Sequence, residues 1–388
     1  MEKNYRVLIL SASAGTGHLR AAEALEIACR RHPEIGEVRN VDALTYTNKL
    51  FRDFYSKFYI SLVRNAPTFL GWWYETSDEP WKTDRMRFML DRMNTGPVIR
   101  MIKKFKPDMT ICTHFLPAEI MSHLISRGAV EARLSIVVTD LDFHAMWLSR
   151  LFHHYFVALD ETKAHLTMLG LPEDRITVSG IPVDPVFAEQ KDKTEMRLKH
   201  GLDAARPVLL LSAGAYGVGP AAAVVKVLTL LKAPAQIVVI CGKNEELRQQ
   251  VQSMSPQIPP HLALKVLGFT HEMDEWMAAA DLYIGKPGGL TTAETLCKSL
   301  PMVIFSPIPG QEERNSDHLL EKGAAIKCND IVTMAYKIDR LLASPERLEA
   351  MRRASRMMSR PDAAERVVET LVDQFHREPH QMVMPDKS

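Results

Sequence analysis

The chain has 388 residues, of which 46% are hydrophobic and 24% are charged. This composition is typical of folded globular protein and leaves enough length for two domains that each bury a core. Its 48 Lys and Arg residues nearly balance 47 Asp and Glu residues, so the formal net charge is +1. That balance excludes a global field that would attract nucleic acid, and we expect no nucleic-acid partner.

Cysteine usage and hydropathy indicate the compartment. The five cysteines lie far apart and show no CxxC spacing, which argues against a disulfide framework or a structural zinc site and favours a reducing cytoplasm. Val7–Leu10 is too short for a signal segment, and no run reaches the roughly 20 apolar residues that span a bilayer. We therefore expect a cytoplasmic protein in which any membrane contact is peripheral.

Short apolar runs alternate with helical stretches along the chain, which predicts parallel strands of an α/β fold. The first series of expected strands is 6–11, 38–43, 109–113, 134–139, 155–159 and 176–179. The second series is 208–212, 236–241, 262–266, 282–285, 302–305 and 325–328. Two doubly wound, Rossmann-like domains facing each other across a cleft are expected, with ligands at the carboxyl ends of the strands.

Composition also divides the chain. We expect a first domain over residues 1–188 and a second over residues 207–343, joined by a charged, apolar-poor linker with a short helix at 189–206. Residues 344–376 are helical by pattern and could pack back on the first domain. The polar tail at 377–388 is expected to be loose.

The first glycine loop runs from Ser11 to His18 and precedes a helix. Backbone amides at a helix N-terminus favour an anion, so a phosphate or an activated hydroxyl could bind there, although a turn without a ligand also needs glycine. Asp42 closes the next strand, as in a dinucleotide-binding fingerprint. Arg20 and Ala21 stand where such a fingerprint has its third glycine, which disfavours a dehydrogenase.

Further polar loops follow the strands of the second half. Gly214–Pro220 precedes a helix and could cradle a pyrophosphate, or serve only as a tight turn. Gly285–Glu294 begins another helix and brings backbone amides and a lysine beside a candidate diphosphate site. Pro307–Asn315 carries amide and carboxylate groups suited to hydrogen bonds with sugar hydroxyls.

At these residues the chain resembles monogalactosyldiacylglycerol synthases, processive diacylglycerol glucosyltransferases and, more distantly, the peptidoglycan N-acetylglucosaminyltransferase that makes lipid II. The resemblance covers nearly the whole chain. Its motifs are Gly15-Thr16-Gly17-His18 with Ala21-Ala22, Val138-Thr139-Asp140-Leu141 with His144 and Trp147, Gly180-Ile181-Pro182-Val183, Gly288-Gly289-Leu290-Thr291 with Glu294, and Gln311-Glu312 with Asn315. Gly285 departs from the serine or threonine usual before Lys-Pro-Gly-Gly.

The resemblance implies the GT-B architecture and an inverting transfer from a UDP-sugar, a substrate, with no cofactor and no metal on the diphosphate. The acceptor-binding residues it implies are Gly15, Gly17, His144 and Trp147. The donor-binding residues expected are Gly214, Gly217, Gly219, Gly242, Phe269, Lys286, Gly288, Gly289, Leu290, Thr291, Glu294, Gln311, Glu312 and Asn315.

An inverting transfer needs a base on the acceptor hydroxyl. His18 and Asp140 are the candidates: we prefer Asp140 as the base and His18 as a positioning group, with the roles open to exchange. Asp140 and Asp142 also form an Asp-x-Asp pattern, which in another fold holds a metal. Its place in the acceptor half, remote from the donor loops, disfavours that role. We expect His153 and His154 to be surface or core histidines.

Aromatic side chains are interleaved with charges over 51–81, and basic residues are frequent over 85–106. Such surfaces suit the interface of an anionic membrane, although the aromatics could instead belong to the core. By resemblance this region would hold the lipid acceptor.

The function expected from the sequence is transfer of a hexose from a UDP-sugar to a lipid such as diacylglycerol. Two alternatives remain open: transfer to a soluble aglycone or cell-wall precursor, and a non-catalytic nucleotide-sugar sensor.

Overall fold

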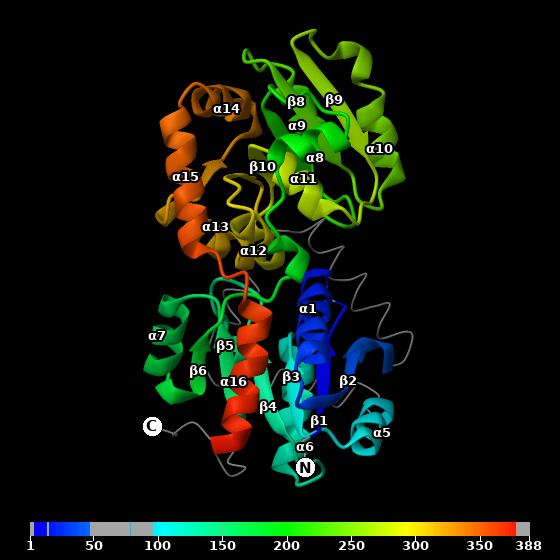
Figure 1. Ribbon diagram of the computed structural model, residues 1–388, viewed down its shortest axis with the longest axis vertical. Coiled ribbons are helices and arrows are strands. Elements are labelled where there is room, and N and C mark those ends of the chain that lie inside the picture. Colours follow the sequence, from blue (N-terminus) through cyan, green and yellow to red (C-terminus); the bar gives the residue numbers. More distant parts are fainter. Residues whose placement is uncertain (1–3, 14, 47–77, 79–95, 150, 378–388) are drawn as a thin grey trace. The chain divides into compact units, whose positions relative to one another are not determined.

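The computed structural model describes residues 4–13, 15–46, 78, 96–149 and 151–377. These residues form two compact units (Figure 1). Unit 1 comprises the described residues up to Pro185 together with those from Arg360 onward, and unit 2 comprises Val186–Ser359. Most of the aromatic segment expected at a membrane, including Trp72 and Trp73, lies outside the described residues.

Unit 1 is built on a six-stranded sheet whose paired strands are all parallel, in the order β2-β1-β3-β4-β5-β6. The strands are β1 (Tyr5–Ser11), β2 (Ile35–Asp42), β3 (Met109–Cys112), β4 (Arg133–Val137), β5 (His154–Val157) and β6 (Ile176–Val178). The helices are α1 (Gly17–Arg31), α5 (Gly96–Phe105), α6 (Phe115–Ser126), α7 (Asp160–Met168) and α16 (Ala363–Arg377).

Unit 2 repeats this plan with a parallel sheet in the order β12-β11-β10-β7-β8-β9. The strands are β7 (Val208–Ser212), β8 (Ala235–Ile240), β9 (Leu262–Leu267), β10 (Leu282–Gly285), β11 (Met302–Phe305) and β12 (Ala325–Cys328). The helices are α8 (Lys193–Lys199), α9 (Ala221–Leu228), α10 (Glu245–Gln252), α11 (Met273–Ala279), α12 (Gly289–Cys297), α13 (Gln311–Glu321), α14 (Met334–Leu342) and α15 (Pro345–Met358).

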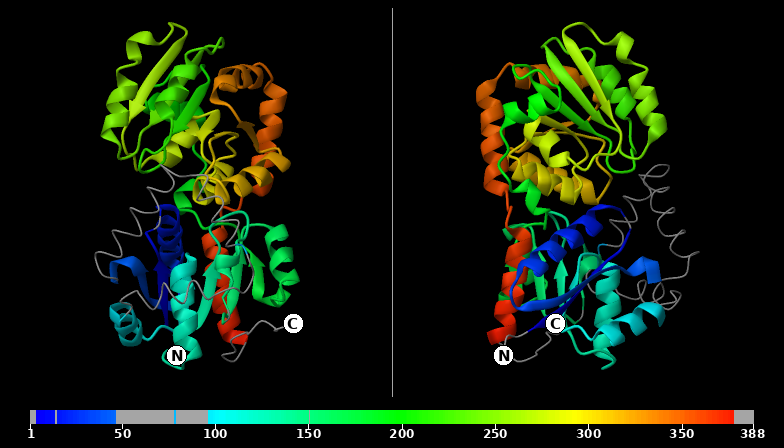
Figure 2. Two further views of the ribbon diagram at one scale, coloured as in Figure 1. Left: turned by 180° about the vertical axis from the view of Figure 1, so that it is seen from behind. Right: turned by 45° about the vertical axis from the view of Figure 1, so that its right-hand side comes forward.

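Helices cover both faces of each sheet (Figure 2), which explains the continuous apolar runs in the sequence. Every residue of β3, β4, β5, β7 and β8 is buried, whereas the edge strands β2 and β9 include exposed residues. Successive side chains of β1 enter different cores: Leu8 and Leu10 pack in the cluster of α5 and α6, and Val7 and Ile9 in that of α1 and α16. The expected α/β fold is confirmed in both units.

Each sheet has a point at which the strand order reverses. In unit 1 the chain moves from β1 to β2 on one side, then returns to place β3 on the other side of β1. In unit 2 the chain runs from β7 through β8 to β9, then places β10 on the other side of β7. The loops at the carboxyl ends of two such neighbouring strands diverge and leave room for a ligand. This topology directs attention to the loops after β1 and β3 and after β7 and β10.

The last helix, α16, belongs to unit 1 and packs on α1. Val367, Val368, Leu371 and Val372 of α16 are buried in the cluster that contains Val7 and Ile9. A buried aliphatic side chain stabilises a fold by about 1.5–3 kcal/mol, so this helix is part of the core of unit 1. Of the two helices formed by the segment expected to be helical, the other, α15, packs on α12 and α14 in unit 2.

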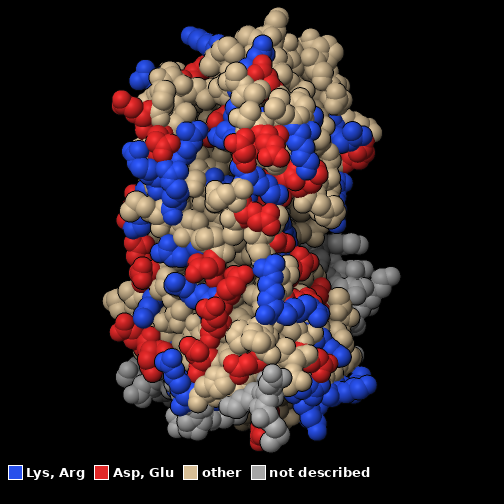
Figure 3. Space-filling view, viewed as in Figure 1, with Lys and Arg blue, Asp and Glu red and all other residues tan. Residues whose placement is uncertain are grey.

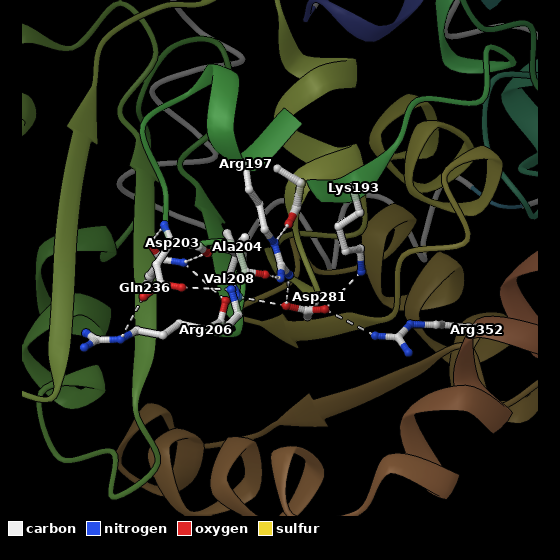
Figure 4. Close-up of polar contacts among 11 residues, drawn as sticks. Lys193, Arg197, Asp203, Ala204, Arg206, Val208, Gln236, Asp281 and Arg352 are labelled. Carbon is white, nitrogen blue, oxygen red and sulfur yellow. Dashed lines mark hydrogen bonds and ion pairs between the residues drawn. The ribbon is translucent and has the colours of Figure 1, made fainter. Parts of the chain in front are cut away.

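A half-buried carboxylate joins the segment expected as a linker to the sheet of unit 2 (Figure 4). Asp281, just before β10, accepts hydrogen bonds from the Val208 amide at 2.8 Å, from Lys193 Nζ at 3.0 Å and from the Arg197 guanidinium. Arg352 of α15 lies 3.4 Å from the same carboxylate. Burial opposes its ionisation, but these cations and the amide outweigh that effect and lower the pKa of Asp281. The helix α8 is thereby an integral part of unit 2.

Candidate active site

In unit 1, His18 lies at the start of α1, beside the loop that follows β3. Its Nδ1 is 2.9 Å from the Thr113 carbonyl oxygen and 2.8 Å from Thr139 Oγ1. Because a carbonyl oxygen can only accept, Nδ1 carries the proton and Nε2 carries the lone pair. Burial lowers the pKa of His18 to about 4, while the hydrogen bond to the Thr113 carbonyl acts in the opposite direction. The imidazole is therefore neutral at pH 7, with Nε2 able to accept a proton.

His114 joins this group, and the sequence analysis did not single it out. Its ring lies 4.6 Å from that of His18, edge to face. His114 is the N-cap of α6, where its Nδ1 accepts a hydrogen bond from the Leu116 amide at 3.1 Å. Burial and the neighbouring His18 lower its pKa well below the ordinary value. The signal in the sequence was its place directly after an expected strand, the position that Asp140 also occupies.

The candidate base Asp140 and two of the expected acceptor residues, His144 and Trp147, lie near this pair to differing degrees. The Trp147 ring is 6.3 Å from that of His18, and Asp140, 5% exposed, directly follows the Thr139 that contacts His18. His144 caps the turn that carries Trp147, with Nδ1 accepting from the Met146 amide at 3.1 Å.

The expected glycine turn of unit 1 stands at the N-terminus of the first helix. Thr16 is the N-cap of α1 and Gly17 its first residue, immediately before His18. Gly15 has a φ of +125°. The turn therefore presents the first backbone amides of α1 next to the imidazole.

In unit 2, a pocket of about 120 Å³ opens between the loops that follow β7 and β10. It therefore lies at the point where the strand order reverses. Six of the expected donor residues line it together: Gly214, Gly219, Lys286, Gly288, Thr291 and Glu312. Ser212, Ala213, Val218, Ala221, Tyr283 and Phe305 complete its walls.

The loops after β7 and β8 approach each other closely at two glycines. Gly242 has a φ of +59°, and a Cβ there would stand 2.3 Å from the carbonyl oxygen of Gly214. Gly217 is in similar contact with the loop after β8, since its Cβ would lie 2.4 Å from that of Asn244. Both positions need glycine to shape the loop that bounds the pocket. Neither of these two glycines is among the residues that line the pocket.

Phe269 follows β9, and its side chain is 49% exposed. Lys243 Nζ lies over the Phe269 ring at 5.4 Å from its centroid, so the aromatic face is presented beside the loop that contains Gly242. An exposed aromatic ring therefore lies at the edge of these loops.

Helices α12 and α13 position the remaining expected donor residues. Gly288 is the N-cap of α12, and Gly289, Leu290 and Glu294 are buried within that helix. Asn315 of α13 is buried and donates from Nδ2 to the Pro287 carbonyl at 3.1 Å, which ties α13 to the loop before α12.

Glu312 and Gln311 begin α13. A carboxylate oxygen of Glu312 accepts from the Ile308 amide at 2.6 Å, and the other lies 3.6 Å from where a Cβ of Gly288 would stand. Gln311 is the first residue of α13 and is half-buried. The structure thus brings Glu312 to the glycine loop before α12.

Tyr283 is a pocket residue that the sequence analysis missed. It stands two residues before Gly285 on β10, so both face the same side of the sheet. A Cβ at Gly285 would lie 2.6 Å from Tyr283 Cε1. The Ser212 and Thr291 side chains lie beside the Tyr283 hydroxyl, and burial raises the pKa of this tyrosine, which keeps it protonated. The unusual glycine therefore makes room for a tyrosine ring that supplies a hydroxyl to the pocket wall.

One group among the described residues places three potential metal ligands together: His200, Glu272 and Glu275. Lys199 Nζ lies 2.6 Å from Glu275, and His200 Nε2 lies 2.9 Å from it, so protein cations and hydrogen bonds already occupy this carboxylate. His153 and His154 are both buried. His154 accepts or donates to Thr177 and Gln374 at 2.8 Å each, which places it in the core between β6 and α16.

Two family models match the chain. Residues 18–183 match monogalactosyldiacylglycerol (MGDG) synthase, and residues 221–367 match the glycosyltransferase family 28 C-terminal domain. A processive diacylglycerol beta-glucosyltransferase of Bacillus cereus (strain AH187) is 30% identical over 399 residues, covering 98% of this chain and 96% of the relative. The chain belongs to the family of the monogalactosyldiacylglycerol synthases and processive diacylglycerol glucosyltransferases. It is a glycosyltransferase.

A second relative agrees with that assignment, and two solved structures share the fold. The enzyme of the same name from Staphylococcus saprophyticus is 29% identical over 369 residues, covering 90% of this chain and 88% of the relative. MurG of Acinetobacter baumannii superposes with a TM-score of 0.60 at 17% identity, covering 95% of this chain and 99% of that one. UDP-GlcNAc 2-epimerase of Neisseria meningitidis gives 0.61 at 15% identity, covering 95% and 100%. The glycosyltransferase has the GT-B fold.

Proposed function

We propose that this glycosyltransferase moves a hexose from a UDP-sugar to a lipid acceptor such as diacylglycerol, with inversion at the anomeric carbon. The observation that carries the proposal is the pocket of unit 2, in which glycine loops, a lysine and a helix N-terminus converge. The names of the relatives, diacylglycerol beta-glucosyltransferases, support the lipid acceptor.

The donor diphosphate would bind at the N-terminus of α12. Gly288, its N-cap, lines the pocket together with Lys286 and the Thr291 hydroxyl. Unpaired amides at a helix N-terminus and an adjacent cation stabilise phosphate charge, including the charge that develops on departing UDP. This arrangement supports a transfer in which no divalent metal is needed. Glu312 and Gln311, at the start of α13, would bind sugar hydroxyls, and Phe269 would stack on the base.

His18 is our choice for the base, and Asp140 the alternative. The proton on Nδ1 is directed to Thr113, which leaves Nε2 free to take the proton of the acceptor hydroxyl. Asp140, next to Thr139, would then stabilise the imidazolium that forms. This order reverses the preference drawn from the sequence, because the hydrogen bonds of His18 define which nitrogen can accept.

Contact with an anionic membrane at the cytoplasmic face would bring the enzyme to its lipid. No helix among the described residues has both the length and the apolar character to cross a bilayer. We propose peripheral association, to which the aromatic and basic segment at 51–106 would contribute.

The test is UDP release by the purified protein with a panel of UDP-sugars, with and without diacylglycerol liposomes, in the presence of EDTA. We expect release that requires one sugar and the lipid together. Release with a soluble aglycone or cell-wall precursor, and none with diacylglycerol, would replace the acceptor. UDP-sugar binding with no release to any acceptor would identify a sensor and refute the catalytic proposal.

A further inference from the structure

A second pocket lies on unit 2, away from the loops after β7 and β10, beside the edge strand β12. Its volume is about 450 Å³. Leu320 of α13 and Ala325 and Ile326 of β12 provide its apolar walls. Its other lining residues are Lys327, Tyr336, Lys337, Arg340 and Arg347. Among the described residues that line it there is no carboxylate.

These cations differ from several others on the unit. Lys199, Arg206 and Arg248 each lie beside a carboxylate on the surface, whereas Lys327, Arg340 and Arg347 form no ion pair with any described residue. In a protein whose net charge is only +1, this concentration of positive charge is local. Figure 3 shows lysine and arginine side chains gathered on the side that carries α14 and α15.

The nearby polar groups keep these charges available to a ligand. Lys337 Nζ donates to the Lys327 carbonyl at 2.6 Å, so Lys337 covers the open edge of β12. The Asp339 carboxylate of α14 accepts from the backbone amides of Lys232 and Ala233 at 3.0–3.1 Å. That carboxylate therefore fixes the neighbouring turn. The pocket keeps a net positive character at its mouth.

Exposed apolar side chains surround the same helix. Tyr336 of α14 is 69% exposed and Val332, just before α14, is 67% exposed. Leu230, 65% exposed, lies in the turn that Asp339 holds against α14. Unpaired cations together with an exposed tyrosine and aliphatic side chains are typical of surfaces that meet lipid headgroups and the outer part of the acyl region.

We propose that the pocket beside β12 binds the phosphate of an anionic glycerophospholipid, with Tyr336, Val332 and Leu230 entering the interfacial layer. Lys327, Arg340 and Arg347 would contact the phosphate. The choice of a lipid headgroup over a free phosphate rests on the proposed function, in which the acceptor is a lipid. This surface lies in the unit that we assign to the donor, and none of its residues belongs to the segment at 51–106.

The experiment measures co-sedimentation of the full chain with vesicles of phosphatidylcholine alone or mixed with phosphatidylglycerol, with no UDP-sugar and no diacylglycerol. The test variant combines Lys327→Gln, Arg340→Gln and Arg347→Gln. Each basic residue near an anionic surface strengthens binding about fivefold, so we expect the partition coefficient on phosphatidylglycerol vesicles to fall about 10- to 100-fold. Binding to phosphatidylcholine alone should change little.

The matched control combines Lys199→Gln, Arg206→Gln and Arg248→Gln, which removes the same charge from paired surface positions. It should keep the binding of the parent. Equal loss in both variants, or loss in neither, would overturn the proposal. So would calorimetric binding of free glycerol 3-phosphate at this pocket without vesicle binding. UDP release with detergent-solubilised diacylglycerol should persist in the test variant, whereas failure of the proposed function would show as no release by the parent.

Discussion

Gly285→Ser is the substitution that most directly tests the structure of the donor pocket. Serine is the residue type that resemblance leads one to expect there, so a substitution toward the family pattern would ordinarily be harmless. In this protein the new Cβ would stand 2.6 Å from Tyr283 Cε1, whereas ordinary van der Waals contact begins near 3.4 Å. The buried ring must retreat by about 0.8 Å.

The magnitude follows from two costs. Crowding a packed core destabilises a protein by about 1–3 kcal/mol. Moving the ring also displaces its hydroxyl from the Ser212 and Thr291 side chains beside it, and the loss of one polar contact of this kind costs about 0.5–1.5 kcal/mol. We expect the free energy of unfolding to fall by about 2–4 kcal/mol. The Kd for UDP should rise about tenfold, because a displaced pocket wall weakens binding by about the free energy of one hydrogen bond.

Urea unfolding and calorimetric titration with UDP measure the two effects. The substitution Tyr283→Ile removes the ring, so Gly285→Ser should cost less stability in the Tyr283→Ile background than in the parent, which a double-mutant cycle expresses as a favourable coupling. If the free energy of unfolding of Gly285→Ser lies within about 0.5 kcal/mol of that of the parent, the packing of Tyr283 against Gly285 is refuted. Additive effects of the two substitutions would do the same.

Three further outcomes are expected. His18→Ala should lower kcat by about 10²–10⁴ with the Kd for UDP unchanged, and a larger loss from Asp140→Asn would transfer the role of base to Asp140. Burial lowers the pKa of His154 to about 3, so between about pH 6.5 and 3 the unfolded chain binds more protons than the folded one and stability falls with pH. Lowering the pH from 7 to 5 should reduce the free energy of unfolding by about 2 kcal/mol through this residue. In His154→Gln, the decrease in the free energy of unfolding between pH 7 and pH 5, measured by urea unfolding, should be smaller by that amount. Asp281→Asn, which leaves three cations without their shared carboxylate, should lower the free energy of unfolding by about 3 kcal/mol; a loss below about 1 kcal/mol would show that the network is not needed for folding.

Sequence patterns predicted the strands of both sheets because burial on two faces leaves continuous apolar runs. Val208–Ser212 and Leu134–Val137 are buried throughout. Each therefore stands in the sequence as a short, mainly apolar run. Helix starts were similarly visible from the glycine turns before α1 and α12. These features are local, so the sequence alone contains the information.

The features that only the tertiary structure determined depend on contacts between residues that are distant in the sequence. The reversal of strand order brings Thr113 and Thr139 to His18, more than 90 positions away from either, and thereby defines which imidazole nitrogen can accept a proton. The role of Gly285 became clear only from the position of the Tyr283 ring. The basic pocket beside β12 combines three helices and a strand whose charges look ordinary in the sequence. Spacing along a chain reports periodicity, whereas proximity across a sheet is set by topology and packing.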